Sequence, residues 1–370
     1  MNMILKIWWL AFLVLNLSCP GISHAQTFPD RAIKMIVPYT PGGGTDTVAR
    51  MLSEKISSDL KWTILIDNKP GGGGNIGMDL VAKSKPDGYT LGMGQTSNLA
   101  INPALLPKMP FDAVNDLIPV AFVAEVPMVL VVTTNSPWKS LADLVKAAKA
   151  KPDFYKQATA GTGTVGHIGG EMLAAKAGYK VIYIPYKGAS PAITDLIGGQ
   201  TDFMFATPQS VLGMIAGGKL RALAVSSVNR IAILPKIPTI SEEGYKGFEA
   251  TDWKIVVAPT GTPSDVIKKI NEAVQAALKQ PALINKLTEE ASSPMYGDPS
   301  AVLKYIRAEQ REWDAAVKAA GYKLGSKYTV TLGTYDENNC PNFVSKTIRV
   351  SKITRTVTKV NIACKGDDNG

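Results

Sequence analysis

The sequence predicts a mixed α/β protein with two lobes around a cleft, followed by a β-rich extension. Short apolar strands alternate with amphipathic helices from about residue 32 to residue 205, which is typical of doubly wound sheets. The chain is helical from residue 264 to residue 319. Beyond residue 328 it alternates Thr and Val with polar residues, as antiparallel strands do.

The first unit is expected to run strand, helix, strand, helix, strand. In its first helix the apolar residues Val48, Met51, Leu52 and Ile56 recur at i, i+3, i+4 and i+8, so they share one helix face. Helical crossovers between the strands indicate a parallel sheet. The expected strands are 32–38, 63–67 and 89–93, and the expected helices are 46–60 and 75–84.

A second unit of the same kind follows. Its expected strands are 129–133, 156–159, 181–185, 202–206 and 220–226, and its expected helices are 141–150, 167–177 and 192–197. A strand expected at 120–123 belongs to the first unit, which ends near residue 125. A strand at 253–258 precedes helices at 264–279, 282–290 and 299–319, each with a proline near its start, where a missing N–H removes no bond. These helices pack most economically on the first unit. We therefore expect lobe boundaries at 26–125 with 250–324, and 126–249.

The first 25 residues have the organisation of a secretory signal peptide. Lys6 gives a positive start, the run from Ile7 to Leu15 is apolar, and Ser23 and Ala25 place small residues before a cleavage site. The apolar run is about half of the ~20 residues that a membrane span needs. We therefore expect residues 1–25 to be removed and the protein to be secreted.

Composition excludes several classes of chemistry. After cleavage the chain would keep one histidine, His167, and two cysteines, Cys340 and Cys364, too few for a zinc site. A secreted protein has no access to cytosolic ATP or NAD. Lys and Arg exceed Asp and Glu by 40 − 31 = 9, but no run of four basic residues occurs. This spacing indicates a solvated basic surface and no nucleic-acid interface.

Three glycine-rich loops each connect a strand to a helix, at residues 41–45, 71–74 and 159–167. Glycines let the backbone approach a ligand closely, and the first N–H groups of a helix have no partner inside the helix. Together with the helix dipole they form an anion site. The third loop adds threonine hydroxyls, which suit carboxylate oxygens. The alternative for each loop is a plain tight turn.

Other motifs in these loops are weak. G-x-G-x-x-G occurs twice, beginning at Gly72 and Gly161, without the acidic residue that a dinucleotide site needs at the end of the next strand. Neither a Walker loop nor a G-x-S-x-G nucleophile motif is present. We expect His167 to cap or pack a helix start, with ligand contact as the alternative. Asp46 and Asp202 are expected to cap helices or orient the backbone.

Seven segments together resemble the periplasmic solute-binding proteins of tripartite tricarboxylate transporters, also called the Bug family. The resemblance covers about residues 26 to 324, and the segments are 28–50, 68–77, 85–94, 159–167, 186–205, 218–227 and 234–244. It implies a type II periplasmic binding fold, a periplasmic location and a monomer. It also implies capture of a small organic acid in the cleft and delivery to the membrane subunits of a transporter, without enzyme activity, cofactor or metal.

The resemblance also implies the ligand-binding residues. One carboxylate would meet the first loop, and the other end of the ligand would meet the third, where threonine stands at two of three positions that are commonly serine in the family. The complete set is Tyr39, Thr40, Pro41, Gly42, Gly43, Gly44, Thr45, Asp46, Thr96, Thr159, Gly161, Thr164, His167, Lys187, Gly188, Ala206 and Thr207.

Residues 325–370 extend beyond this resemblance. Segment 328–350 resembles the closing half of a PKD-type β domain, with strands expected at 328–332, 347–350 and 354–362 and a turn at 336–339. Cys340 and Cys364 could form a disulfide in an oxidising compartment. A tail of foreign origin, from a fusion, is the alternative.

Three other functions remain open at this stage. The same cleft could present its ligand to a membrane histidine kinase, the protein could be a secreted hydrolase, or the tail could serve adhesion. Which carboxylate is bound does not follow from the sequence, because loops that bind carboxylates through the backbone accept many acids.

Overall fold

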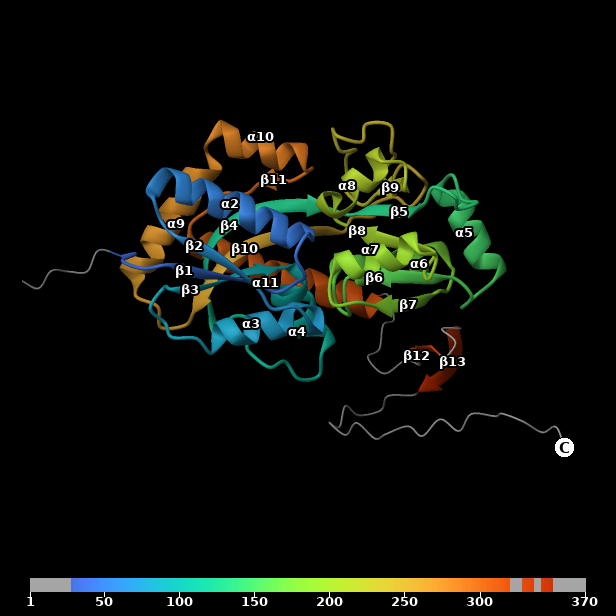
Figure 1. Cartoon of the computed structure of the whole chain (residues 1–370), viewed down its shortest axis with the longest axis horizontal. Coiled ribbons are helices and arrows are strands. Elements are labelled where there is room, and N and C mark those ends of the chain that lie inside the picture. Colours follow the sequence, from blue (N-terminus) through green and yellow to red (C-terminus); the bar gives the residue numbers. More distant parts are fainter. Residues whose placement is uncertain (1–27, 320–327, 336–340, 349–370) are drawn as a thin grey trace, which may run out of the picture.

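The computed structural model describes residues 28–319, 328–335 and 341–348. It contains two large β-sheets with helices on both faces of each, arranged side by side, and a two-stranded sheet in the tail (Figure 1). We call the six-stranded sheet with its helices lobe 1 and the five-stranded sheet with its helices lobe 2. The expected signal peptide, both cysteines and the expected strand at 354–362 lie outside the described residues.

Lobe 1 has strand order β11-β4-β10-β3-β1-β2. The strands β2, β1 and β3 are parallel, whereas β10 is antiparallel to both β3 and β4. The prediction of a parallel sheet is therefore correct for these three strands, but the sheet as a whole is mixed. The strands are β1 (Ile33–Val37), β2 (Ile64–Asn68), β3 (Thr90–Gln95), β4 (Leu117–Pro127), β10 (Thr251–Pro259) and β11 (Ser293–Pro294).

Alternating side chains of these strands build a core on each face of the sheet. Ile33, Met35 and Val37 pack towards one group of helices, while Ile36 belongs to the core on the opposite face. The first group is α2 (Gly44–Leu60), α9 (Ser264–Leu278) and α10 (Pro281–Glu289). The second group is α3 (Asn75–Ala82), the turns η2 (Ser97–Ile101) and α4 (Asn102–Leu105), and α11 (Pro299–Ala319).

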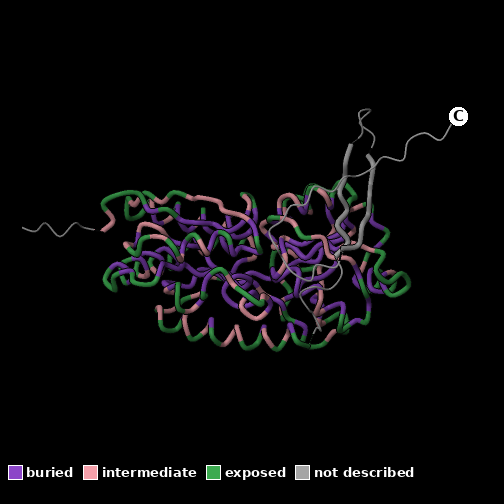
Figure 2. The backbone as a smooth tube through the Cα atoms, turned by 90° about the horizontal axis from the view of Figure 1, so that it is seen from below, coloured by how far each residue is buried: buried purple, intermediate pink, exposed green. Residues whose placement is uncertain are grey.

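Lobe 2 has strand order β7-β6-β8-β5-β9, again with a parallel part and with β5 antiparallel to its two neighbours. Its strands are β5 (Val129–Thr133), β6 (Lys156–Thr159), β7 (Ile182–Pro185), β8 (Phe203–Ala206) and β9 (Leu220–Val225). Helices α7 (Ala189–Ile197) and α8 (Pro208–Ala216) pack on one face, and α5 (Leu141–Ala150) and α6 (Val165–Ala177) on the other. Figure 2 shows the buried residues gathered in the interior of each lobe.

The chain crosses between the lobes twice, once from β4 to β5 and once from β9 to β10. Ser226 joins the two crossings, because its Oγ accepts from the amide of Met128 at 2.8 Å and donates to the carbonyl of Ala250 at 2.5 Å. The two crossings between the lobes are thus hydrogen-bonded to each other through Ser226.

Most expected elements are present with ends that differ by up to four residues, whereas the strand expected at 347–350 begins six residues earlier, as β13. The sequence did not predict α8, β11 or the turns η1 (Gly72–Gly74), η2 and α4. In the tail, β12 (Tyr328–Tyr335) pairs antiparallel with β13 (Pro341–Ile348). Among the described residues, no helix has both the length and the apolar character required to cross a membrane.

Candidate functional site

A cavity of about 40 Å³ lies between the two lobes. Its wall is formed by the first turns of α2, α6 and α7, the residue before α8, the ends of β3 and β8, and the start of β10. The lining residues are Tyr39, Gly43, Gly44, Thr45, Gln95, Met128, Ala160, Thr164, Val165, Gly166, Ala189, Met204, Phe205, Ala206, Thr207 and Asp252.

Four helices begin at this cavity, and each begins without a side-chain cap. The N-cap residues are Gly43 for α2, Thr164 for α6, Gly188 for α7 and Thr207 for α8, and none of them has a side chain that accepts from a backbone amide of its own first turn. The first amides of each helix are therefore left without side-chain acceptors, and four helix dipoles place partial positive charge at one point. This arrangement favours an anion.

Asp46 shapes the first glycine loop. Its Oδ2 accepts from the amide of Gly42 at 3.0 Å and from Nε of Arg50 at 2.8 Å, and its Oδ1 accepts from Nδ2 of Asn68 at 2.9 Å. Burial raises the pKa of Asp46, but these hydrogen bonds and the Arg50 charge outweigh it and leave the pKa below its usual value. Asp46 thus orients the backbone, as expected, although it does not cap α2.

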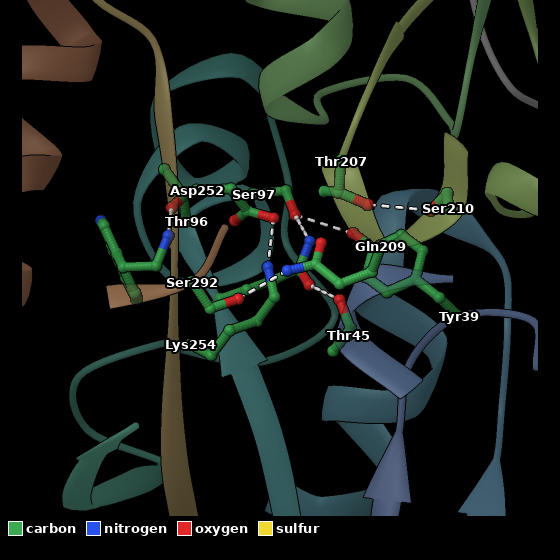
Figure 3. A network of polar contacts seen from close by, with 12 residues as sticks. Tyr39, Thr45, Thr96, Ser97, Thr207, Gln209, Ser210, Asp252, Lys254 and Ser292 are labelled. Atoms are coloured by element: carbon green, nitrogen blue, oxygen red, sulfur yellow. Dashed lines mark hydrogen bonds and ion pairs between the residues drawn. The ribbon is translucent and has the colours of Figure 1, made fainter. Parts of the chain in front are cut away.

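A chain of hydrogen bonds lies on the lobe 1 side of the cavity (Figure 3). Thr45 Oγ1 donates to Gln95 Oε1, and Gln95 Nε2 donates to Ser97 Oγ at 2.9 Å. The hydroxyl of Tyr39 lies 2.7 Å from Ser97 Oγ and also 2.7 Å from the carbonyl of Gly73. Burial raises the pKa of Tyr39, so its phenol keeps its proton at neutral pH. The chain fixes the Tyr39 ring against the second glycine loop.

Strand β10 contributes a buried ion pair that sequence reasoning missed. Nζ of Lys254 lies 2.5 Å from Oδ2 of Asp252, and the Lys254 side chain is 0% exposed. Asp252 lines the cavity, whereas Lys254 does not. The two residues are two apart on one strand, so their side chains project to the same face of the sheet. The signal in the sequence was that Asp252 directly precedes the apolar strand expected at 253–258.

His167 supports the third glycine loop from behind. Its Nδ1 accepts from the amide of Gly163 at 3.2 Å, and its ring packs edge-on against Tyr183 at 5.2 Å. Burial lowers the pKa of His167 to about 4, so the imidazole is neutral at physiological pH. In the same loop Thr164 Oγ1 donates to the carbonyl of Gly161 at 2.8 Å. His167 thus accepts from the loop backbone and packs near the start of α6.

The two lobes are in contact around the cavity. Ser190 Oγ donates to the carbonyl of Pro41 at 2.7 Å, and Gln209 Nε2 donates to Ser292 Oγ at 2.5 Å. A Cβ added to Gly188 would lie 2.2 Å from Thr40 Oγ1. The lobes are therefore closed over the cavity, and glycines permit their close approach.

The structure brings together seven of the seventeen residues expected to bind ligand. Tyr39, Gly43, Gly44, Thr45, Thr164, Ala206 and Thr207 line the cavity. Thr40, Pro41, Gly42, Asp46, Thr96, Thr159, Gly161, His167, Lys187 and Gly188 do not. Of these, Thr96 Oγ1 accepts from the amide of Trp253 at 2.9 Å, Lys187 is exposed, and Thr159 is buried. The remaining lining residues were not expected. Gln95 could have been found as a polar residue ending an apolar strand.

No group of His, Cys, Asp and Glu within residues 28–319 and the two tail strands could hold a metal ion. The cavity wall is instead made of backbone amides, hydroxyls, one amide side chain, one carboxylate and apolar groups. Such a wall can hold a small anion by hydrogen bonds and exclude water around it.

Comparison with known proteins agrees with this geometry. A family model described as tripartite tricarboxylate transporter family receptor matches residues 48–322. The solved structure of periplasmic binding protein BugD is 33% identical with a TM-score of 0.77, over 80% of this chain and 99% of that one. Rpa4515 of R. palustris with adipate is 33% identical with a TM-score of 0.78, over 80% and 98%. MatC of Rhodopseudomonas palustris with bound malate is 30% identical with a TM-score of 0.75, over 78% and 100%.

Proposed function

Because the chain belongs to the tripartite tricarboxylate transporter family of receptors, we propose that it captures a small organic carboxylate between its two lobes and delivers it to the membrane subunits of a transporter. Members of this family are periplasmic binding receptors, not enzymes. We propose the same location for this chain, with residues 1–25 as its signal peptide, and a monomeric receptor.

The convergence of four uncapped helix N-termini supports the carboxylate assignment most strongly. A carboxylate placed in the cavity can accept from the amides at Gly44 and Thr45 and from the hydroxyl of Thr207, whose Oγ1 also lies 2.8 Å from Ser210 Oγ. Charge-assisted hydrogen bonds of this kind contribute ~1.5–3 kcal/mol each. Two solved relatives hold adipate and malate, which are both carboxylates.

The remaining expected residues act around this contact. We propose that Asp46 and His167 hold the first and third loops in shape, and that Thr40 and Gly188 meet across the cleft as it closes. We propose lobe boundaries at 26–125 with 250–324, and 126–249, a division supported by the crossings of the chain between β4 and β5 and between β9 and β10. In this proposal ligand capture is a closing motion about the crossings, with Ser226 at the hinge.

A thermal-shift screen of the purified protein against a panel of organic acids tests this proposal. A ligand at 100 times its Kd stabilises a protein by ~2.7 kcal/mol, which corresponds to roughly 5 °C or more. We expect such a shift with carboxylates and none with neutral analogues. The protein is unfolded and refolded first, so that a ligand retained through purification cannot mask binding.

Gly43 provides a matched pair of variants for the screen. A Cβ at this position would lie 3.4 Å from the carbonyl of Thr40 and 3.9 Å from Cβ of Ala189, which are ordinary contacts. Gly43→Ala should therefore retain the shift. Gly43→Asp places a carboxylate where the ligand's carboxylate is proposed to bind, and should abolish it. An undiminished shift in Gly43→Asp would show that the site is wrong.

A further inference from the structure

Asp252 lines the cavity with one carboxylate oxygen unused. Oδ2 forms the 2.5 Å ion pair with Lys254, whereas Oδ1 is buried and has no hydrogen-bond partner among the described residues. Asp252 as a whole is 4% exposed. Figure 3 shows Asp252 on β10, with a dashed line joining its carboxylate to Lys254.

An unpaired carboxylate oxygen in a buried site is costly unless a donor reaches it. The described residues that line the cavity include no Lys, Arg or His that could approach Oδ1. The nearby donors are already engaged: Lys254 Nζ with Oδ2, and Gln95 Nε2 with Ser97. A ligand in the cavity can supply the missing donor.

Resting on the proposed function, we infer that the ligand is a carboxylate with a hydrogen-bond-donating substituent, an ammonium or a hydroxyl group, on a carbon close to its carboxyl group. The carboxylate binds the helix N-termini, and Asp252 Oδ1 accepts from the substituent. The small cavity, about 40 Å³, favours a ligand whose two groups are close together.

Lys254 makes this arrangement compatible with an anionic ligand. Its ammonium group compensates the charge of Asp252, so the pair as a whole is neutral and does not repel an entering carboxylate. An unsubstituted acid would leave Oδ1 buried without a donor, and so would bind more weakly. Asp252 therefore determines specificity, while the helix N-termini provide general affinity for carboxylates.

Two sets of acids that differ only in the substituent test the inference by calorimetry on the refolded protein. The first set is succinate, malate and aspartate, and the second is propionate, lactate and alanine. On at least one carbon skeleton, we expect the hydroxy or amino acid to bind roughly tenfold or more tighter than the unsubstituted acid. The hydroxy and amino members of each set show which donor is preferred.

Variants assign this preference to Asp252. In Asp252→Asn we expect the ratio between substituted and unsubstituted acid to fall to about threefold or less. This variant leaves Lys254 buried without its counter-charge, so the double variant Asp252→Asn/Lys254→Met is measured as well.

Glu309→Gln is the matched control. Glu309 Oε2 accepts from Nε1 of Trp253 at 2.7 Å, and Trp253 is the residue between Asp252 and Lys254 on β10. Glu309 itself does not line the cavity. The control should keep the wild-type ratio.

One comparison needs no variant. 2-Methoxysuccinate keeps the oxygen of malate but lacks its donated hydrogen, and we expect it to bind no tighter than succinate. If succinate and propionate bind as tightly as their substituted partners, or if both Asp252 variants keep the preference, the inference is wrong while the carboxylate receptor stands. If no acid of either set or of the wider panel binds, the proposed function fails and the inference fails with it.

Discussion

His167 and Glu171 lie one turn apart on α6, with Nε2 and Oε1 3.9 Å from each other. Burial moves their pKa values in opposite directions. It lowers the pKa of His167 from 6.5 to about 4, because the imidazolium is desolvated. It raises the pKa of Glu171 from 4.5 to about 7, with a hydrogen bond from Tyr183 acting against the rise. Both groups are therefore pushed towards their neutral forms.

The two shifts affect stability in different pH ranges. Glu171 has a folded-state pKa above its unfolded value. Its contribution to the free energy of unfolding is therefore complete below about pH 4.5 and is lost as the pH rises through 7. His167 has a folded-state pKa below its unfolded value, so its contribution is present above pH 6.5 and is lost as the pH falls through 4.

Glu171→Gln isolates the first of these effects. We expect it to raise the free energy of unfolding by about 1–3 kcal/mol at pH 8 and to change it little at pH 4.5. The reason is that the buried wild-type carboxyl carries a charge only at the higher pH. Urea unfolding at the two pH values measures this. Glu272→Gln removes an acid whose side chain is 62% exposed, and should have no pH-dependent effect. Equal effects of Glu171→Gln at both pH values would contradict the assignment.

At the scale of elements, the two crossings between the lobes depend on Ser226. Its side chain satisfies the buried amide of Met128 and the carbonyl of Ala250, and its backbone bonds the same two residues, with the amide to Met128 O at 2.9 Å and the carbonyl from Ala250 N at 3.1 Å. The β4–β5 and β9–β10 crossings are thus held together at one residue.

Ser226→Ala should therefore destabilise the protein. Two buried backbone groups would lose a partner, which costs about 2 kcal/mol or more. Denaturant unfolding at neutral pH measures the change. Ser227→Ala is the matched control, since Ser227 Oγ donates to the carbonyl of Asn229 in an exposed turn and should contribute little. Equal stability of the two variants would show that Ser226 does not fix the hinge.

Elements and site differ in how far the sequence predicts them. Strands, helices and glycine loops depend on local periodicity and composition, and the structure contains them. Periodicity does not indicate pairing direction, so the antiparallel β10 and β5 could not be derived. Helix α8 buries only Pro208 and Val211, too few positions to form an apolar stripe along one face. Asp252 approaches the site only because β10 pairs with β3, with Lys254 opposite Gln95. Such pairings join segments more than 150 residues apart.

At the scale of the whole molecule, the account requires the lobes to close. Gly188 tests this, because its φ of 161° suits any residue but its added Cβ would lie 2.2 Å from Thr40 Oγ1 and 3.0 Å from the amide of Thr40 in the other lobe. We expect Gly188→Ala to weaken carboxylate binding roughly tenfold or more with little change in stability, since the clash exists only when the lobes meet. Calorimetric titration and unfolding together measure this.

Gly213→Ala is the control for that variant. It lies in α8, and an added Cβ there has no neighbour within 4 Å. The substitution should leave affinity unchanged and leave stability unchanged or slightly higher, because Ala favours helices. Wild-type affinity in Gly188→Ala would mean that binding does not need the closed contact between Thr40 and Gly188.

The central claim is that the convergent helix N-termini bind a carboxylate. The most direct measurement is calorimetric titration of the refolded protein with its tightest acid and with the corresponding neutral carboxamide. The account predicts one acid bound per chain and an amide that binds about 100-fold more weakly or not at all, because the dipoles and charge-assisted bonds favour the anion. An amide that binds as tightly as the acid would contradict it.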